Sequence, residues 1–309
     1  MNLLIPMILK QIKGIGSIKI RNIIENNSLP KSINEVEDWL EFVLYKESVN
    51  SKRVSNEQFK YILEEVNKTK EDSIKNNIEM VSILDNKYPR LLKEINDAPI
   101  ILFYKGNYDC LINENIVAII GTRHITDNGT RVAYKTSKYF SELDYSIVSG
   151  LAIGCDTYAH KAAVDSKKST IAVMPCGLDT IVPKVNNKLA DDILESNGCL
   201  VSEYECGSEL YKYNYVKRNR IQSGLSKGVI VIETSEKGGT VETINLGIKQ
   251  NKIIACYDCD EDYEEIRGNK KFVKEGKAFK YKTLNDLIII EKKIRENYGF
   301  SSQQLNFNI

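Results

Sequence analysis

The stretch IVAIIGTRHITDNG, residues 116–129, decides the fold class. A run of Val, Ala and Ile ends at Gly121 and polar residues follow, as where a buried parallel strand enters a phosphate-binding turn. A dinucleotide-binding G-x-G-x-x-G turn would have its second glycine at position 123, where this sequence has Arg123. The stretch therefore predicts a nucleotide-type turn in which a long cation replaces a glycine.

Strand-like and helix-like segments alternate from residue 80 onward. Because the predicted strands are apolar throughout and separated by helices, they indicate a parallel sheet covered on both faces. We predict an α/β fold with a doubly wound, mostly parallel, Rossmann-like sheet, extended by two early strands. The strand candidates are 80–85, 99–107, 115–121, 145–150, 170–176, 199–204, 229–234 and 252–257.

The first 78 residues show helical periodicity and no convincing strand. We predict a small helical domain over 1–78 and an extended Rossmann-like domain over 79–309, with a charged, exposed helix between 46 and 78 at the boundary. Gly14-Ile15-Gly16 joins two apolar helical stretches. Such a turn is typical of a helix-hairpin-helix whose backbone N–H groups meet a DNA phosphate, or it is simply a tight interhelical turn.

Composition limits the classes of protein. The 309 residues are 42% hydrophobic and 28% charged with a formal net charge of +1, as in an ordinary soluble protein. Nucleic-acid binding would therefore require a local basic patch. We find no signal peptide and no apolar run near the ~18 residues of a membrane span. Seven irregularly spaced cysteines indicate a cytoplasmic location, and the lone C-x-x-C pair, Cys256 and Cys259, predicts no metal site.

The ends of the predicted strands carry the candidate ligand contacts, because parallel sheets bind ligands beyond the carboxyl ends of their strands. Four of the five loops there contain glycine, which allows backbone N–H groups to approach an anion beside a helix N-terminus. Arg123, Lys184 and Arg218 lie in or near these loops. Together they predict a groove whose lining binds phosphates. The predicted phosphate-loop residues are Gly121, Thr122, Gly150, Gly154, Gly238, Gly239 and Thr240.

A long loop opens at Ser202 and runs to Arg220, with a helix inside residues 214–226. Residues 210–227, LYKYNYVKRNRIQSGLSK, contain five basic residues, no acidic residue and three tyrosines that alternate with basic side chains. Cations on phosphates and aromatic rings on bases hold single-stranded nucleic acid. The alternative is a basic amphipathic helix with its tyrosines in the core. We favour nucleic acid.

Catalytic groups are scarce. The chain has two histidines, His124 and His160, and Asp156 lies four residues before His160 on a predicted helix. No nucleophile or carboxylate cluster accompanies them, so we predict a structural role for the pair and neither a catalytic residue nor a metal.

Several of these segments resemble the DprA/Smf family of DNA-processing proteins. VAIIGTR, SGLAIGCDTYAH, TIAVMPCGLDTIVP, LVSEY, KRNRIQSGLS and KGGTVET occur in the family's order, and the similarity covers roughly residues 85–285. The resemblance implies a cytoplasmic homodimer without a cofactor that binds and protects single-stranded DNA. It also implies loading of the RecA recombinase during recombination and natural transformation, and it is compatible with a sterile-alpha-motif-like domain at the N-terminus.

The resemblance also assigns DNA-contacting residues. They fall on Arg123, Lys184, Lys212, Tyr215, Arg218, Asn219 and Arg220, and the basic character of 210–227 adds Lys217. This sequence departs from the family pattern at Val182 for Tyr, at Val216 for Pro and at CYDCD for Pro-Gly. It also ends at SSQQLNFNI, so we expect no C-terminal winged-helix domain. A paralogue that serves defence or mobile-element maintenance therefore stays open.

Two alternative hypotheses about function remain, an enzyme and a nucleotide sensor. KGGTVET is faintly similar to a stretch of cytokinin-activating phosphoribohydrolases, in which Glu242 would help to cleave the glycosidic bond of a nucleoside monophosphate. The other is a nucleotide-sensing module that signals to a partner.

Overall fold

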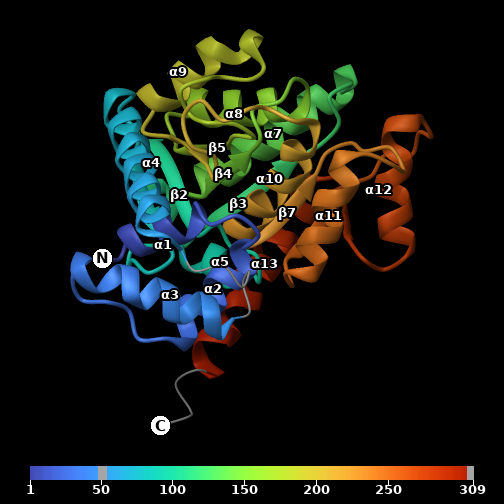
Figure 1. The fold of residues 1–309 in the computed structure, drawn as a ribbon. Helices are drawn as coiled ribbons and strands as arrows, with labels where there is room; N and C mark the ends of the chain where they lie inside the picture. The colour runs from blue at the N-terminus through green and yellow to red at the C-terminus, as the bar shows by residue number, and fades with distance from the viewer. Residues whose placement is uncertain (48–53, 305–309) are drawn as a thin grey trace.

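A nine-stranded sheet runs through the molecule in the order β1-β2-β6-β5-β4-β3-β7-β8-β9 (Figure 1). The structure is a computed structural model that describes residues 1–47 and 54–304. Strands β3 to β9 are parallel, and β1 and β2 extend the sheet in antiparallel pairing at one edge. The predicted Rossmann-like α/β fold is confirmed.

The central strands are buried along their whole length, as expected where helices cover both faces of a sheet. The strands are β1 (Glu79–Ser82), β2 (Ile101–Gly106), β3 (Ile116–Ile120), β4 (Ser146–Ser149), β5 (Thr170–Val173), β6 (Cys199–Ser202), β7 (Gly228–Val231), β8 (Ile253–Tyr257) and β9 (Phe279–Tyr281). The sequence prediction did not include β9, which has three residues and exposes two of them.

Helices cover the sheet on both sides. On one face, α7 (Asp127–Glu142), α8 (Cys155–Asp165) and α13 (Leu284–Gln304) share a core cluster with the central strands. On the other, α5 (Arg90–Lys93), α10 (Lys212–Leu225) and α11 (Gly239–Lys249) pack together. The remaining helices of this region are α6 (Asp109–Ile112), α9 (Asn187–Glu195), α12 (Glu264–Lys274) and the short 3-10 helix η2 (Lys184–Asn186).

The N-terminal helices pack directly against the sheet domain. They are α1 (Leu4–Lys10), α2 (Ser17–Asn26), η1 (Ile33–Glu35), α3 (Val36–Lys46) and α4 (Asn56–Lys75). Their apolar side chains belong to the same core cluster as strands β2 and β6, and Arg21 of α2 donates hydrogen bonds to the backbone carbonyls of Lys93, at the end of α5, and Ile95. Helix α4, which we expected to be exposed, buries Phe59, Ile62 and Val66. The domain division at residue 78 stays a prediction.

The order of the strands creates a crevice at the centre of the sheet. Strand β3 is flanked by β4 on one side and by β7 on the other, so successive connections leave β3 in opposite directions. Such a switch point is where doubly wound sheets bind ligands. In the described part of the chain, no helix is long and apolar enough to cross a membrane.

Candidate functional site

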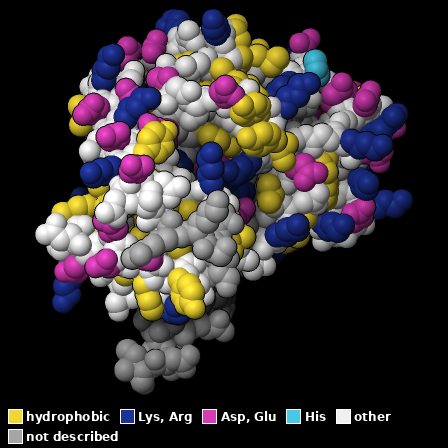
Figure 2. All heavy atoms as spheres, in the orientation of Figure 1, with side chains coloured by type: hydrophobic (Ala, Val, Ile, Leu, Met, Phe, Trp, Pro, Cys, Tyr) yellow, Lys and Arg dark blue, Asp and Glu magenta, His cyan; other side chains and the backbone are white. Residues whose placement is uncertain are grey.

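A cavity of about 400 Å³ opens at the carboxyl ends of β3 and β7, at this switch point. Four segments line it: the loop after β3, the loop after β4, helix α10 and the loop that leads into α11. In Figure 2, Lys and Arg side chains gather at the centre of the view, over the position of α10 in Figure 1. The principal lining residues are Gly121, Thr122, Arg123, Asp156, Tyr215, Arg218, Asn219, Gln222, Gly238, Gly239 and Thr240.

Arg123 and Tyr215 form a pair beside the cavity. The central carbon of the exposed Arg123 guanidinium lies 5.1 Å from the centroid of the Tyr215 ring, a cation–π distance. The pair joins the loop after β3 to α10. It places a positive charge and an aromatic ring side by side at the cavity.

Arg218 brings a second cation, this one buried. Its side chain is 4% exposed, its Nη1 donates to the carbonyl of Val173 at 2.8 Å, and its Nε has no partner among the described residues. Burial lowers the pKa of Arg218, while the nearby Asp156 carboxylate opposes that shift. An arginine keeps its charge under such a perturbation. The cavity therefore borders a fixed cation with an unused donor.

The Asp156 carboxylate lies where an anion would bind to the backbone N–H groups of the loop after β4. Its Oδ2 accepts hydrogen bonds from the backbone N–H groups of Gly150 at 3.1 Å and Ala152 at 3.2 Å. Leu151, between them, has a left-handed backbone with φ of 57°. Burial raises the pKa of Asp156, and the charge of Arg218 opposes that rise. These two backbone donors are therefore already used by an internal carboxylate.

The Glu233 carboxylate likewise occupies the place of an anion at the N-terminus of α7. This buried carboxylate accepts from the backbone N–H of Thr126 at 2.9 Å and from its hydroxyl at 2.6 Å. The hydroxyl of Tyr263 donates to it as well, at 2.8 Å. The N-terminus of α7 is thus compensated from within the protein.

The N-terminus of α11 differs from that of α7. Gly238, with φ of 128°, precedes the helix, and no side chain caps its first turn. Gly238, Gly239 and Thr240 all line the cavity. An uncapped N-terminus of an 11-residue helix favours an anion. Together with Arg123 and Arg218, it makes the cavity suited to a phosphate beside a flat ring.

The structure brings nine of the predicted site residues to the cavity: Arg123, Tyr215, Arg218, Asn219, Gly121, Thr122, Gly238, Gly239 and Thr240. Six others lie outside its lining: Lys184, Lys212, Lys217, Arg220, Gly150 and Gly154. Lys184 is exposed on η2 and Lys212 is exposed at the start of α10. The N–H of Gly150 is taken by Asp156, and Gly154 precedes α8 with φ of 82°. Asn219 donates to the carbonyl of Gly239 at 3.2 Å and so ties α10 to α11.

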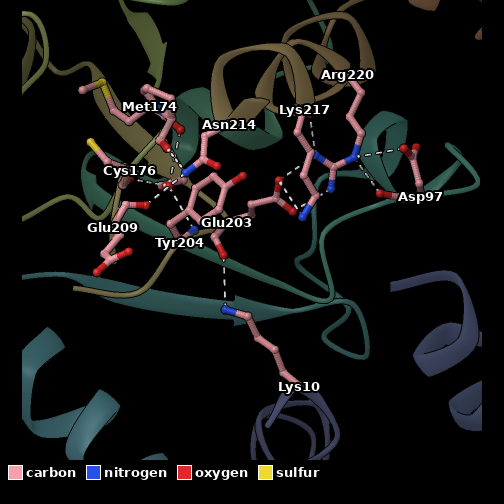
Figure 3. A network of polar contacts seen from close by, with 12 residues as sticks. Lys10, Asp97, Met174, Cys176, Glu203, Tyr204, Glu209, Asn214, Lys217 and Arg220 are labelled. Atoms are coloured by element: carbon pink, nitrogen blue, oxygen red, sulfur yellow. Dashed lines mark hydrogen bonds and ion pairs between the residues drawn. The ribbon is translucent and has the colours of Figure 1, made fainter. Parts of the chain in front are cut away.

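Arg220 faces away from the cavity into a polar network (Figure 3). Its guanidinium donates to both carboxylate oxygens of Glu203 at 2.7 and 2.6 Å and to the carbonyl of Asp97 at 2.9 Å. The ammonium of Lys217 lies 3.8 Å from Glu203, and that of Lys10 donates to the Glu203 carbonyl at 3.2 Å. This network fixes α10 against the end of β6 and against the N-terminal helices.

The reason for this division is that the expected long loop is helical from Lys212 onward. On a helix, residues three and four apart share a face. Tyr215, Arg218, Asn219 and Gln222 accordingly line the cavity while Arg220 does not. Gln222 was not among the predicted site residues, although this spacing places it on the same helix face, and Asp156 was predicted to have a structural role only.

The other candidate groups lie apart from the cavity. His160 hydrogen-bonds through Nδ1 to the Thr170 hydroxyl at 2.7 Å rather than to Asp156. Glu242 is exposed and does not line the cavity. Among the described residues, no group of three or more potential metal ligands occurs. Ile15 and Gly16 line a second cavity, of about 370 Å³, with Lys10, Glu203 and Lys217.

Sequence comparisons show which known proteins this chain is similar to. The family model of DNA recombination-mediator protein A matches residues 79–291. Protein Smf of Synechocystis sp. is 31% identical over 277 residues, which cover 86% of this chain and 67% of that protein. DNA processing protein DprA of Streptococcus pneumoniae is 41% identical over 171 residues, which cover 55% of this chain and 60% of that protein. The match therefore spans about two thirds or less of these relatives.

Solved structures agree with the sequence matches. The X-ray structure of DprA from Streptococcus pneumoniae matches with a TM-score of 0.70 and 30% identity, covering 89% of this chain and 98% of that chain. DprA from Helicobacter pylori, whose structure is described as giving insight into a single-stranded DNA binding mode, matches with a TM-score of 0.63 and 27% identity. That match covers 71% of this chain and 96% of the other.

Proposed function

This chain belongs to the family of DNA recombination-mediator protein A, and from that premise we propose that its central cavity binds single-stranded DNA. The observation that carries the proposal is the convergence of three features on one cavity. They are the Arg123–Tyr215 pair, the buried Arg218 with its unused Nε, and the uncapped N-terminus of α11. The single-stranded DNA binding named for the Helicobacter pylori relative supports it.

Each feature has a distinct task in this proposal. The N-terminus of α11 and Arg123 hold a phosphate, because no side chain caps the first turn of α11 and the exposed Arg123 guanidinium lies beside the cavity. The Tyr215 ring offers a base a surface for stacking. Lys184 and Lys212 are exposed and supply further cations along the strand, and Lys217 adds another from its exposed position beside Glu203. Arg220, engaged by Glu203 and Asp97, holds α10 in place.

We propose a binding role without catalysis and without a cofactor. In the phosphoribohydrolase reading, Glu242 would have to reach the bound nucleotide, and its exposed position outside the cavity lining gives that reading no support. The nucleotide-sensing reading predicts binding of free nucleotide in preference to a strand.

In the cell, we infer a cytoplasmic homodimer that protects single-stranded DNA and promotes loading of a RecA-type recombinase. The family's description as a recombination mediator supports this role. Natural transformation is the pathway that the resemblance favours, and defence or mobile-element maintenance is the alternative for a paralogue with Val182 and Val216 at motif positions.

Fluorescence anisotropy with a labelled oligo-dT tests the binding proposal. We expect affinity to fall steeply with salt, because the chain is nearly neutral overall and binding depends on local phosphate contacts. Arg123→Ala should weaken binding about tenfold and reduce the slope of log affinity against log salt by about 1.

The matched control is Arg131→Ala, which removes the same charge from an exposed position on α7. It should bind as the unchanged protein does. No anisotropy change at micromolar protein and low salt would refute the proposal, as would equal losses in the two variants.

A further inference from the structure

We propose that Tyr211 and Tyr213 form a second nucleobase site, a stacking platform at the start of α10 that extends the cavity. The proposal rests on the proposed function of the cavity and names where the neighbouring base of the strand goes. Neither tyrosine belongs to the motif segments that carry the family resemblance.

The two rings are arranged for stacking. Their centroids lie 5.4 Å apart with an interplanar angle of 8°, and the side chains are 47% and 62% exposed. Aromatic rings stack in this offset, parallel way, and a nucleobase can continue the stack because every base has a π face. The platform therefore accepts a base without selecting a sequence.

Asn214, which Figure 3 shows beside Glu209, anchors the first turn of α10. This side chain is buried, and its Nδ2 donates to the carbonyls of Pro175 at 3.1 Å and Glu209 at 3.3 Å. The hydroxyl of Tyr211 donates to the carboxylate of Glu209. The first turn of α10 is thus anchored to the end of β5, so little conformational freedom is lost when a base stacks on it.

Helical spacing connects the platform to the cavity. Tyr213 lies three residues before Val216 on α10, and Val216 lines the cavity. Side chains at this separation are neighbours on a helix, about 5–6 Å apart at Cβ. Tyr211, the residue just before the helix, joins this row through its stacking on Tyr213. Lys212, between the tyrosines, is exposed and has no ion-pair partner within residues 1–47 and 54–304. A strand that leaves the cavity along α10 meets a cation and an aromatic stack together.

This combination favours a nucleobase over a protein partner. Lys212, which lies between the two tyrosines in the sequence, adds an exposed cation for a phosphate to the rings that accept a base. Glu209 lies at the hydroxyl end of Tyr211, where it orients the ring. A protein-docking role would leave the affinity for bases unchanged, which the following experiment measures.

The test uses a double variant, Tyr211→Ser combined with Tyr213→Ser. Its affinity is compared with that of the unchanged protein on two oligonucleotides of equal length. One is oligo-dT and the other carries abasic sites throughout. We expect the double variant to lose about fivefold or more in affinity for oligo-dT, in line with one lost stacking contact. Its affinity for the abasic strand should equal that of the unchanged protein, which also shows that the variant is folded. Tyr61→Ser, which removes an equally exposed tyrosine from α4, is the control and should change neither affinity.

A second variant, Tyr211→Phe with Tyr213→Phe, keeps the rings and should recover most of the oligo-dT affinity that the serine variant loses. Unchanged oligo-dT binding by the serine variant would overturn the platform and leave the cavity proposal intact. Equal losses on both oligonucleotides would also overturn it, because stacking cannot act on an abasic strand. Failure of the unchanged protein to bind oligo-dT would overturn both proposals.

Discussion

Arg218 and Arg220 show how two arginines two positions apart on α10 acquire different tasks. Arg220 is paired with Glu203 and donates to two backbone carbonyls, so its guanidinium is satisfied within the protein. Arg218 has Asp156 as its nearby counter-charge and keeps Nε without a partner in the described chain. A buried cation needs a compensating charge, and both have one. Only Arg218 also borders the cavity with an unused donor.

His160 is a buried histidine that stays neutral. The Thr170 hydroxyl donates to the carbonyl of Ile147 at 2.8 Å and therefore accepts from Nδ1–H of His160, while Nε2 is buried without a partner among the described residues. Burial, together with the charge of Arg218, lowers the pKa of His160 to about 3. In the unfolded chain a histidine takes up a proton near pH 6.5. Stability contributed by the neutral form is therefore complete above about pH 6.5 and is lost as pH falls from there towards 3.

We predict that His160→Asn reduces the pH dependence of stability. Between pH 7 and pH 5 the unchanged protein should lose about 2 kcal/mol more in free energy of unfolding than this variant, since only its unfolded state gains the histidine proton. Urea denaturation at the two pH values measures the difference. His124→Asn, at the exposed second histidine, should keep the full dependence. An identical pH dependence in the two variants would contradict the assignment.

At the scale of elements, periodicity predicted the sheet and most of its helices. Buried Val and Ile runs such as 116–120 leave little choice but a central parallel strand. The start of α10 was missed because Tyr211, the residue before it, has no capping side chain, and the usual Ser, Thr, Asp or Asn signal is absent. Strand β9 was missed because Phe279 and Lys280 are exposed and show no buried pattern.

The site was predictable where it depends on loop chemistry and not where it depends on packing. Gly121, Arg123, Gly238 and Gly239 follow predicted strands, and the topology of the sheet brings those loops together. The occupation of the β4 loop by Asp156 requires a left-handed Leu151, a conformation that leaves no signal in the sequence. Only the folded structure therefore shows which of the glycine-containing loops can still bind a ligand.

Gly150 is the point where strand β4 and helix α10 meet. A Cβ at this position would lie 1.7 Å from Nη1 of Arg218, so an added methyl group must displace the guanidinium. We predict that Gly150→Ala lowers the free energy of unfolding by about 1–3 kcal/mol through overpacking and weakens oligo-dT binding, because Arg218 leaves the cavity border. Thermal unfolding and anisotropy measure the two effects.

Gly239→Ala is the matched control for stability. A Cβ there would meet only Nδ2 of Asn219, at 4.0 Å, so the melting temperature should change little. A Gly150→Ala protein with unchanged melting temperature and unchanged affinity would show that α10 adapts to the methyl group without cost.

At the scale of the whole molecule, the sheet ends in an unprotected edge. Strand β9 pairs only with β8 within the described residues, and Phe279 is exposed on it. Leu284, Ile288 and Ile289 of the following helix α13 are exposed as well. Open strand edges with apolar neighbours are avoided in monomers, and a two-fold axis buries such a surface against its own copy. This surface therefore suits the proposed homodimer.

We predict that Ile288→Glu combined with Ile289→Glu converts the proposed dimer to a monomer, as measured by light scattering during size-exclusion chromatography. The charges would have to be buried against the same charges of the second copy, which costs more than the lost apolar contact alone. Phe42→Glu with Tyr45→Glu, on the exposed apolar side of α3, is the control and should leave the mass unchanged.

Loss of the dimer should also lower the affinity for long strands more than the affinity for short ones. A dimer presents two cavities, so a strand long enough to reach both binds the second at high effective concentration, whereas a short oligonucleotide occupies one. The Ile288→Glu, Ile289→Glu protein should thus lose affinity for long oligo-dT by about a hundredfold or more and keep its affinity for a short one. A monomeric unchanged protein would contradict the dimer. Equal losses of affinity on both lengths would show that one strand does not reach both cavities.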